Sequence, residues 1–294
     1  MLRYFYNVES LISAQFSHLL FMQGENMSEI VTIDITDHIA HVKLNRPEKM
    51  NALNAEMFTA IIDAGEKVAA DRSLRVVVLS GEGRGFCAGL DVGSCMAMGK
   101  GADNKELAFF NKPVGSSANY AQLVGYIWKQ VPVPVIAAVH GVAFGGGLQL
   151  ALAADIRLAS QDARFSVMEI KWGLIPDMSG TQTLRDLVRL DVAKELTYTG
   201  RIVEADEAAE LGLVTKLCDD PVAAALEMAA EIAGKSPDAI AAGKTLLENA
   251  WHGRSADGLG LEASLQKTII MQENQMEAVM ATFEKRPPRF KDRK

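Results

Sequence analysis

Cysteine is scarce in this chain, with three residues (Cys87, Cys95 and Cys218) among 294. Their odd number and their spacing fit neither a disulfide framework nor a metal site, so we expect reduced thiols and a cytoplasmic protein. The five histidines are scattered, and the H-E-x-x-H pattern of zinc enzymes is absent. The sequence therefore predicts no metal and no resident cofactor.

Basic residues are in the minority: 30 Lys and Arg stand against 37 Asp and Glu, giving a net charge of −7 and a pI of about 5.4. Without a basic, aromatic stripe, this balance argues against nucleic-acid binding. Residues 130–154 carry no formal charge at all, but two prolines and four glycines interrupt them and their period changes. A buried strand followed by a buried helix is predicted there, and no membrane span.

A dinucleotide-binding fingerprint is also missing. Residues 81–91, GEGRGFCAGLD, place glycines at positions 81, 83 and 85, and irregular chain follows them. The Rossmann pattern needs G-x-G-x-x-G opening directly into a helix, so a NAD-dependent dehydrogenase is not predicted. What this loop does offer is close backbone approach to a ligand, with N–H groups pointing outward.

Hydrophobic periodicity predicts an α/β core followed by a helical C-terminal third. Residues 30–45 alternate as two antiparallel strands with a turn at Asp37 and His38. Residues 92–118 lack a clear period and are predicted to form a mobile loop over a pocket. The predicted buried strands span 75–81, 133–141 and 155–160, and the predicted helices span 55–70 (with Asn54 as N-cap), 118–130, 145–155, 190–198, 205–211, 221–234, 236–251 and 256–284.

Three parts of the chain follow from this pattern. Residues 1–26 are apolar and aromatic, fit neither a transit peptide nor a signal peptide, and are expected to lie outside the core. Residues 27–220 are predicted to form the α/β core. Residues 221–294 are predicted to form a helical region that packs on a neighbouring subunit, so an oligomer is expected.

A second glycine-rich loop, AFGGGLQLAL at 143–152, lies at a predicted strand-to-helix junction. Free N–H groups at the start of a helix form a site for a negative or developing-negative oxygen. A glycine run of this kind is also a common tight turn. Because both glycine loops follow buried strands, their N–H groups are expected to meet at the carboxyl ends of neighbouring strands and to grip one oxygen from two sides.

Two acids stand out in MEIKWGLIPDMSGTQ, residues 168–182. Glu169 and Asp177 flank an apolar segment with a Gly/Pro turn, where an unpaired ionised carboxylate costs several kcal/mol to bury. Apolar neighbours raise carboxyl pKa values, and mutual repulsion keeps one of the two acids protonated. One acid is then a base while the other donates. Asp177 has a second interpretation as the N-cap of a helix that starts at SGTQTL.

These motifs, in this order and spacing, resemble the crotonase (enoyl-CoA hydratase/isomerase) superfamily. The resemblance is carried by RGFCAGLD (84–91), HGVAFGGGLQLALAADIRLAS (140–160) and ARFSVMEIKWGLIPDMSGTQTL (163–184), with RPEKMNALN near the start and FEKRPPRFK near the end, and it covers roughly residues 28–292. It implies a spiral of ββα units with an α-helical C-terminal trimerisation region, assembled as trimers or pairs of trimers. It also implies an acyl-CoA thioester as substrate, bound by the α/β core, so that coenzyme A enters as part of the substrate.

The resemblance also implies roles for single residues. It places an oxyanion hole at the backbone N–H groups of Leu90 and Gly146, where a thioester enolate would be stabilised. It places coenzyme A along two loops and the C-terminal segment. The residues implied in binding it are Lys49, Ala52, Ala88, Asp91 and Lys291.

The candidate catalytic residues are Glu169, Asp177 and Gln149. Hydratases of this family use two glutamates, and Gln149 stands at the earlier of the two positions. An amide cannot exchange a proton as an acid, so Gln149 either is a buried, hydrogen-bonded amide or holds a water or the acyl chain. Asp177 stands where hydratases carry glycine, whereas dienoyl-CoA isomerases carry a Glu and an Asp at this spacing. Double-bond isomerisation by Glu169 and Asp177 is therefore favoured.

Three other functions stay open. In an enoyl-CoA hydratase, Asp177 would replace the glutamate missing at Gln149. In an acyl- or aryl-CoA hydrolase or dehalogenase, Asp177 would be the nucleophile, although no histidine is placed to activate the water of the second step. The chain could also bind CoA or RNA without turnover, but the presence of Glu169 argues against an inactive enzyme.

Overall fold

The computed structural model describes residues 30–91, 93 and 109–294. The predicted N-terminal extension and most of the predicted 92–118 loop lie outside these residues. None of the helices in the described ranges combines the length and the apolar composition that a membrane crossing requires.

A six-stranded sheet forms the centre of the core, in the order β1-β2-β3-β4-β6-β9. β1 and β2 are antiparallel and the other neighbours are parallel. The strands are β1 (Val31–Thr36), β2 (Ile39–Leu44), β3 (Val76–Gly81), β4 (Val135–Val139), β6 (Ile156–Ala159) and β9 (Lys216–Leu217). The predicted hairpin is confirmed, because Asp37 and His38 both take the positive φ of a tight turn.

A second, three-stranded sheet was not predicted from the sequence. It consists of β5 (Val142–Phe144), β7 (Arg164–Ser166) and β8 (Val203–Glu204). β5 follows β4 directly, so the predicted strand 133–141 ends earlier and the chain then changes sheet. Strands of two or three residues are too short to show a period in the sequence.

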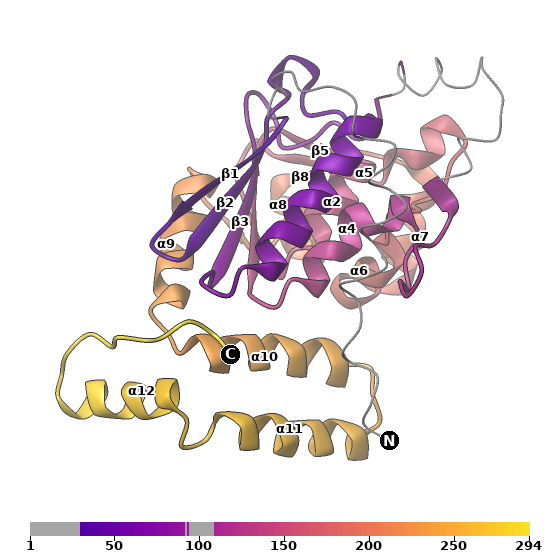
Figure 1. The fold of residues 1–294 in the computed structure, drawn as a ribbon. Helices are drawn as coiled ribbons and strands as arrows, with labels where there is room; N and C mark the ends of the chain where they lie inside the picture. Colours follow the sequence, from indigo (N-terminus) through magenta and orange to yellow (C-terminus); the bar gives the residue numbers. More distant parts are fainter. Residues whose placement is uncertain (1–29, 92, 94–108) are drawn as a thin grey trace.

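Helices cover both faces of the large sheet (Figure 1). On one face α2 (Ala55–Ala70), α4 (Tyr120–Gln130) and α5 (Gly146–Leu152) share the main hydrophobic core with the sheet. On the other face α9 (Pro221–Ala233) packs small alanines against the buried valine and isoleucine side chains of β3 and β4. The predicted α/β fold class is confirmed.

Capping residues fix where the helices around the site begin. The side chain of Asn54 accepts a hydrogen bond from Met57 N–H, so α2 starts and ends where the sequence predicted. At α4, Asn119 and Gln122 cap each other reciprocally. The remaining helices of the core are the 3₁₀ turns η1 (Pro47–Lys49) and η3 (Met168–Trp172), and the α-helices α6 (Gly180–Leu187), α7 (Leu190–Thr199) and α8 (Ala205–Leu211).

The C-terminal helices extend away from the core (Figure 1). They are α10 (Pro237–Ala250), α11 (Ser255–Ile269) and α12 (Glu273–Phe283). The predicted single helix 256–284 is wrong, because Met271 takes a positive φ of 60° and separates α11 from α12. Lys244 anchors α10 to the core, where its buried ammonium group pairs with Asp155 at 2.8 Å. No residue of α11 is buried in the single chain, and the predicted trimerisation role stays a prediction.

Candidate active site

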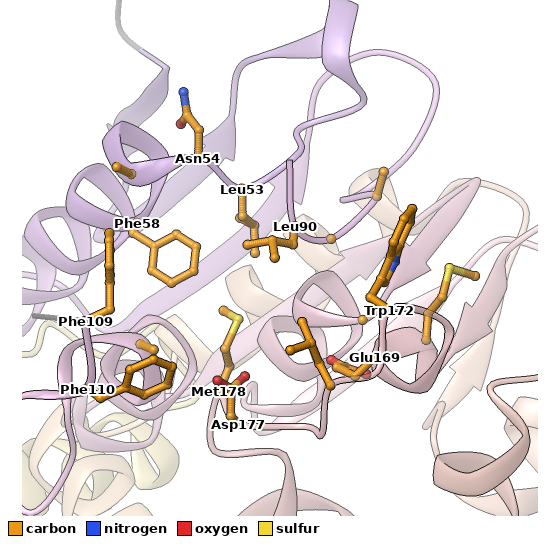
Figure 2. A pocket seen from close by; sticks show the side chains of 17 residues that line it. Leu53, Asn54, Phe58, Leu90, Phe109, Phe110, Glu169, Trp172, Asp177 and Met178 are labelled. Carbon is orange, nitrogen blue, oxygen red and sulfur yellow. The ribbon is translucent and has the colours of Figure 1, made fainter. Parts of the chain in front are cut away.

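An apolar pocket of about 320 Å³ lies between α2, the first glycine loop and the segment from η3 to α6 (Figure 2). Both predicted acids, Glu169 and Asp177, line it. The rest of the wall is mostly apolar. It is formed by Leu53, Asn54, Ala55, Phe58, Ala88, Gly89, Leu90, Phe109, Phe110, Ala121, Gly145, Met168, Trp172, Leu174 and Met178.

The first glycine loop is held in an extended form beside Leu53. Leu53 N–H donates to Gly89 O at 2.8 Å, and Asp91 N–H donates to Leu53 O at 2.9 Å. In a parallel bridge of this kind the residue between the two bonded positions turns its own N–H to the opposite side. The N–H of Leu90 therefore faces away from Leu53, and no backbone oxygen of the described chain accepts from it.

The second glycine loop packs directly against the first. Gly89 has a φ of +87°, and a Cβ placed on it would lie 2.5 Å from Phe144 O and 3.6 Å from Gly146 N. Only glycine allows the backbones to approach this closely. Gly146 is the first residue of α5, where a helix leaves its N–H groups unpaired. The predicted meeting of the two loops is present, and the oxyanion hole at the N–H groups of Leu90 and Gly146 stays a prediction.

Glu169 lies on η3 beside the second loop. A Cβ placed on Gly145 would lie 3.4 Å from Glu169 Oε1, so the carboxyl group borders the end of the loop that carries the Gly146 N–H. Glu169 is 8% exposed; Oε2 is buried and has no hydrogen-bond partner among the described residues. Burial raises the pKa of Glu169 above its ordinary value of 4.5, and the charge of Asp177 adds to this rise, whereas hydrogen bonds from its own N–H and from Gln149 oppose it.

Asp177 reaches the pocket from the segment before α6, and Figure 2 shows its carboxyl group and that of Glu169 along the same wall of the pocket. Burial raises the pKa of Asp177 above its ordinary value of 3.8, and a hydrogen bond from its own N–H opposes the rise. The alternative interpretation of Asp177 as a helix N-cap is wrong. Ser179 is the N-cap of α6, because the chain needs two further residues after Asp177 to turn into the helix.

Gln149 lies behind Glu169 and does not line the pocket. It is a buried, hydrogen-bonded amide on α5, 2% exposed. Its Nε2 donates to Glu169 Oε1 at 2.5 Å, while its Oε1 accepts from Met178 N–H at 2.8 Å and from Gly180 N–H at 2.9 Å. One amide thus connects Glu169 with the segment that follows Asp177.

Four of the five residues expected to bind coenzyme A lie at the first glycine loop or at the turn beside it. Ala88 lines the pocket, and Ala52 N–H donates to Lys49 O at 3.0 Å. Asp91 pairs with Arg46 at 2.9 Å, and the same guanidinium nitrogen donates to Ala52 O. The fifth, Lys291, is not brought to the pocket.

Lys291 lies in the C-terminal segment, where its ammonium group pairs with Glu273 at 2.8 Å.

Sequence reasoning missed two further groups of residues. Asn51 supports the first loop by donating to the carbonyls of Gly85 and Phe86, and the motif RPEKMNALN was the signal for it. The aromatic wall of Phe58, Phe109 and Phe110 left no local signal, because two of these residues follow the irregular segment.

The chain is similar to known proteins. The sequence profile of the enoyl-CoA hydratase/isomerase family matches residues 34–293. The chain belongs to the enoyl-CoA hydratase/isomerase family. It is therefore an enzyme, of the hydratase (lyase) or isomerase type, and the predicted crotonase superfamily and fold are confirmed.

Individual family members differ in the reaction that their names give. The mitochondrial Delta(3,5)-Delta(2,4)-dienoyl-CoA isomerase of Mus musculus is 33% identical over 272 residues, which is 90% of this chain and 82% of that protein. The human protein of the same name is 35% identical over 254 residues, 84% of this chain and 76% of that protein. The crystal structure of enoyl-CoA hydratase from Bacillus anthracis is 31% identical, with a TM-score of 0.80 over 89% of this chain and 98% of that one.

Proposed function

We propose that this enzyme moves double bonds in an unsaturated acyl-CoA, with a 3,5-dienoyl-CoA as substrate and a 2,4-dienoyl-CoA as product. The observation that carries this proposal is the pair of acids, Glu169 and Asp177, on the wall of one apolar pocket, each with a raised pKa. At one of the two positions where hydratases of the family carry a glutamate, this chain carries Gln149, which does not line the pocket. Names of related proteins include this reaction.

In the proposed mechanism the thioester oxygen lies between the N–H groups of Leu90 and Gly146. Glu169 removes a proton from C2, since its carboxyl group borders the loop that holds the thioester oxygen. The C2–H electron pair enters the conjugated system, and negative charge develops on the thioester oxygen, where the two N–H groups stabilise it. Asp177 gives its proton to C6, and the charge returns from the oxygen to form the 2,4-diene.

A transfer from C2 to C6 favours two separate acids over one. The two carbons are four bonds apart in an extended chain, so a carboxyl group in contact with C2 is poorly placed to serve C6 as well. Burial raises the pKa of both acids, and the charge of Asp177 raises the pKa of Glu169 further, as the smaller cause. Glu169 is then the base and Asp177 the acid.

Hydration of a 2-enoyl-CoA is the second candidate, since the same two acids could activate a water and supply the α-proton. The likeness to the Bacillus anthracis hydratase supports it. On the side of Asp177 that lines the acyl pocket, residues such as Phe110 and Met178 offer a water beside the acyl chain few polar contacts, which favours the isomerase.

The test is to incubate the enzyme in D₂O with a 3,5-dienoyl-CoA and, separately, with crotonyl-CoA, and to follow products by mass and by absorbance. We expect the diene to shift into conjugation with the thioester, with one deuterium at C6 and no gain of water. Glu169→Gln and Asp177→Asn should each lower kcat by about 10²-fold or more. Water addition to crotonyl-CoA with no shift of the diene would establish the hydratase instead.

The proposal extends to the coenzyme A contacts and to the oligomeric state. The CoA part would bind along Lys49, Ala52, Ala88 and Asp91, with Lys291 reaching it only from another subunit. We propose a homotrimer or a pair of trimers, because large apolar side chains are exposed on the C-terminal helices; these include Leu247, Trp251, Leu259, Met271 and Phe283. Light scattering coupled to size exclusion would test this.

The proposal also covers the cofactor and the cellular compartment. No cluster of His, Cys, Asp and Glu with the composition of a metal site occurs in the described ranges, and we propose that no resident cofactor takes part. A cytoplasmic location is supported by Cys87 and Cys218, which are both free thiols, although the related isomerases are named mitochondrial. Cell fractionation would distinguish the compartments.

A further inference from the structure

Asp177 lies between two cavities. Among the described residues it is the one that lines both the apolar pocket and a second cavity of about 260 Å³ on its other side. The second cavity lies between the segment before α4, α4 itself and the start of α6. Its polar side chains are Ser117, Gln122, Tyr126, Ser179, Thr181 and Gln182.

This side cavity runs from the surface of the chain to Asp177, which is half-buried. Ser117 and Thr181 are exposed, whereas Ser179, next to Asp177 in space and two residues on in sequence, is buried. The hydroxyl oxygen of Ser179 has no hydrogen-bond partner in the described part of the chain. A polar cavity of this size holds several water molecules. They do not reach the Ser179 oxygen, which is buried beside Gly125.

We propose that the side cavity is a water-filled proton route by which Asp177 exchanges its proton with solvent while the acyl chain occupies the apolar pocket. This inference rests on the proposed isomerisation, and it assigns the two cavities different tasks. The apolar pocket holds the acyl chain, and the polar cavity connects the acid to water. Glu169 lines the apolar pocket and not the side cavity.

The proton balance of the reaction gives this route a purpose. Each turnover moves one proton from C2 to Glu169 and one proton from Asp177 to C6. The enzyme is left with a neutral Glu169 and an ionised Asp177, so it must be reset before the next turnover. A water in the side cavity can give Asp177 a proton, drawn from solvent, before the product leaves. Glu169 loses its proton to water through the apolar pocket once the product has left.

Two titratable groups besides Asp177 are found among the described residues that line the two cavities. One is Glu169 on η3, whose charge interacts with it across the pocket. The other is Tyr126 on α4, which lines the side cavity. Neither is a cation, so no ion pair within the described part of the chain holds Asp177 in its charged form.

The first test fills the mouth of the side cavity with the double variant Ser117→Leu/Thr181→Leu. The matched control is Ser117→Thr/Thr181→Ser, which keeps a hydroxyl at each position. With a 3,5-dienoyl-CoA, kcat and kcat/KM are measured against pH. Wild type and control should show the ionisation of Asp177 in both profiles, because the acid titrates in the free enzyme and in the complex.

In the filled variant, the pH profile of kcat should lose the limb caused by ionisation of Asp177, whereas the pH profile of kcat/KM should keep it. The reason is that the bound acyl chain now locks the acid in one protonation state. Its kcat should fall by about tenfold, with kcat/KM within about twofold of wild type. A filled variant that melts like wild type and retains both the limb and the rate would overturn the proton route.

The second test needs no turnover. Trimethyloxonium, a small cationic reagent that methylates carboxylates, is applied in the presence of saturating octanoyl-CoA, and peptides are mapped by mass. Octanoyl-CoA should protect Glu169 but leave Asp177 reactive, and the filled variant should lose the reaction at Asp177. Equal protection of both acids in wild type would refute the route. If neither acid is protected, octanoyl-CoA does not fill the pocket. That outcome contradicts the proposed acyl-CoA substrate class and, with it, the proposed separation of the two cavities.

Discussion

Replacing Gln149 with glutamate changes a single hydrogen-bonding group at the back of the active site. The amide nitrogen of Gln149 donates to Glu169 at 2.5 Å, and its oxygen accepts from the N–H groups of Met178 and Gly180. A carboxylate at position 149 can still accept both backbone hydrogen bonds. It cannot donate to Glu169, and it brings a second negative charge within hydrogen-bond distance of it.

Two carboxyl groups at this distance share one proton. The two backbone N–H groups stabilise the charged form of the new carboxyl group, so the proton resides on Glu169 and converts the proposed base into an acid. A hydrogen bond to a charged group contributes about 1.5–3 kcal/mol. At about 1.4 kcal/mol per pH unit, the pKa of Glu169 should rise by roughly 1–2 units, and the rate below that pKa should fall roughly 10- to 100-fold.

The assay is the appearance of the conjugated dienoyl thioester as a function of pH. We expect the acid limb of kcat/KM for Gln149→Glu to move to higher pH by roughly 1–2 units. The rate should recover at alkaline pH to the extent that Asp177 stays protonated. Because the folded-state pKa of Glu169 is raised above the unfolded value, the variant should also lose stability, relative to wild type, as pH rises from the unfolded value through the raised one.

Gln149→Met provides the control, since it keeps the side-chain length and adds no charge. It leaves the N–H groups of Met178 and Gly180 buried without partners, which costs about 1–3 kcal/mol each, so its melting temperature should fall while the shift of its pH limb stays smaller. A Gln149→Glu variant whose acid limb and rate equal those of wild type would show that Gln149 does not set the charge of Glu169.

Three further predictions follow from the same contacts. Gly145→Ala places a Cβ on a residue with a φ of +52°, 3.4 Å from Glu169 Oε1. We expect the free energy of unfolding, measured by a thermal melt, to fall by about 1–2 kcal/mol, and kcat to be lower. An unchanged kcat would contradict the placement of Glu169. Lys244→Met leaves the half-buried carboxylate of Asp155 without its cation, so urea unfolding should show a loss of about 3 kcal/mol; Lys244→Met/Asp155→Leu should recover part of it. For the wild-type enzyme, kcat/KM should be bell-shaped in pH: it should rise at the pH where Glu169 ionises and fall at the higher pH where Asp177 loses its proton, and burial places both pKa values above their ordinary range. A profile without an acid limb would exclude Glu169 as the base.

The sequence predicted the fold best where local and periodic signals agree. The helix 55–70 has an apolar stripe and an N-cap at Asn54, and the structure begins and ends it at the predicted residues. The second sheet left no such signal, because its strands have two or three residues. The break between α11 and α12 was missed because Met271 is neither glycine nor proline, and its left-handed backbone is held by Gln275 accepting from Met271 N–H.

In the candidate site, too, some features leave a local signal in the sequence and others do not. Glu169 and Asp177 could be found because their chemistry conflicts with the residues next to them in sequence. The connection through Gln149 could not be found, since Met178 and Gly180 are 29 and 31 residues away along the chain and only the fold brings them together. The side cavity depends on Ser117, which is 60 residues before Asp177, so no local pattern indicates it.

The two acids are close in space, but they differ in what lies behind each carboxyl group. Gln149 donates to Glu169 at 2.5 Å and stabilises its charged form, and this hydrogen bond opposes the effect of burial. Asp177 receives no such bond from a side chain; burial and its own N–H set its pKa. This difference favours a charged Glu169 and a neutral Asp177, which is the pair of protonation states that the proposed mechanism requires. Burying two carboxyl groups in an apolar wall costs stability, but it gives the enzyme one base and one acid of the same chemical type.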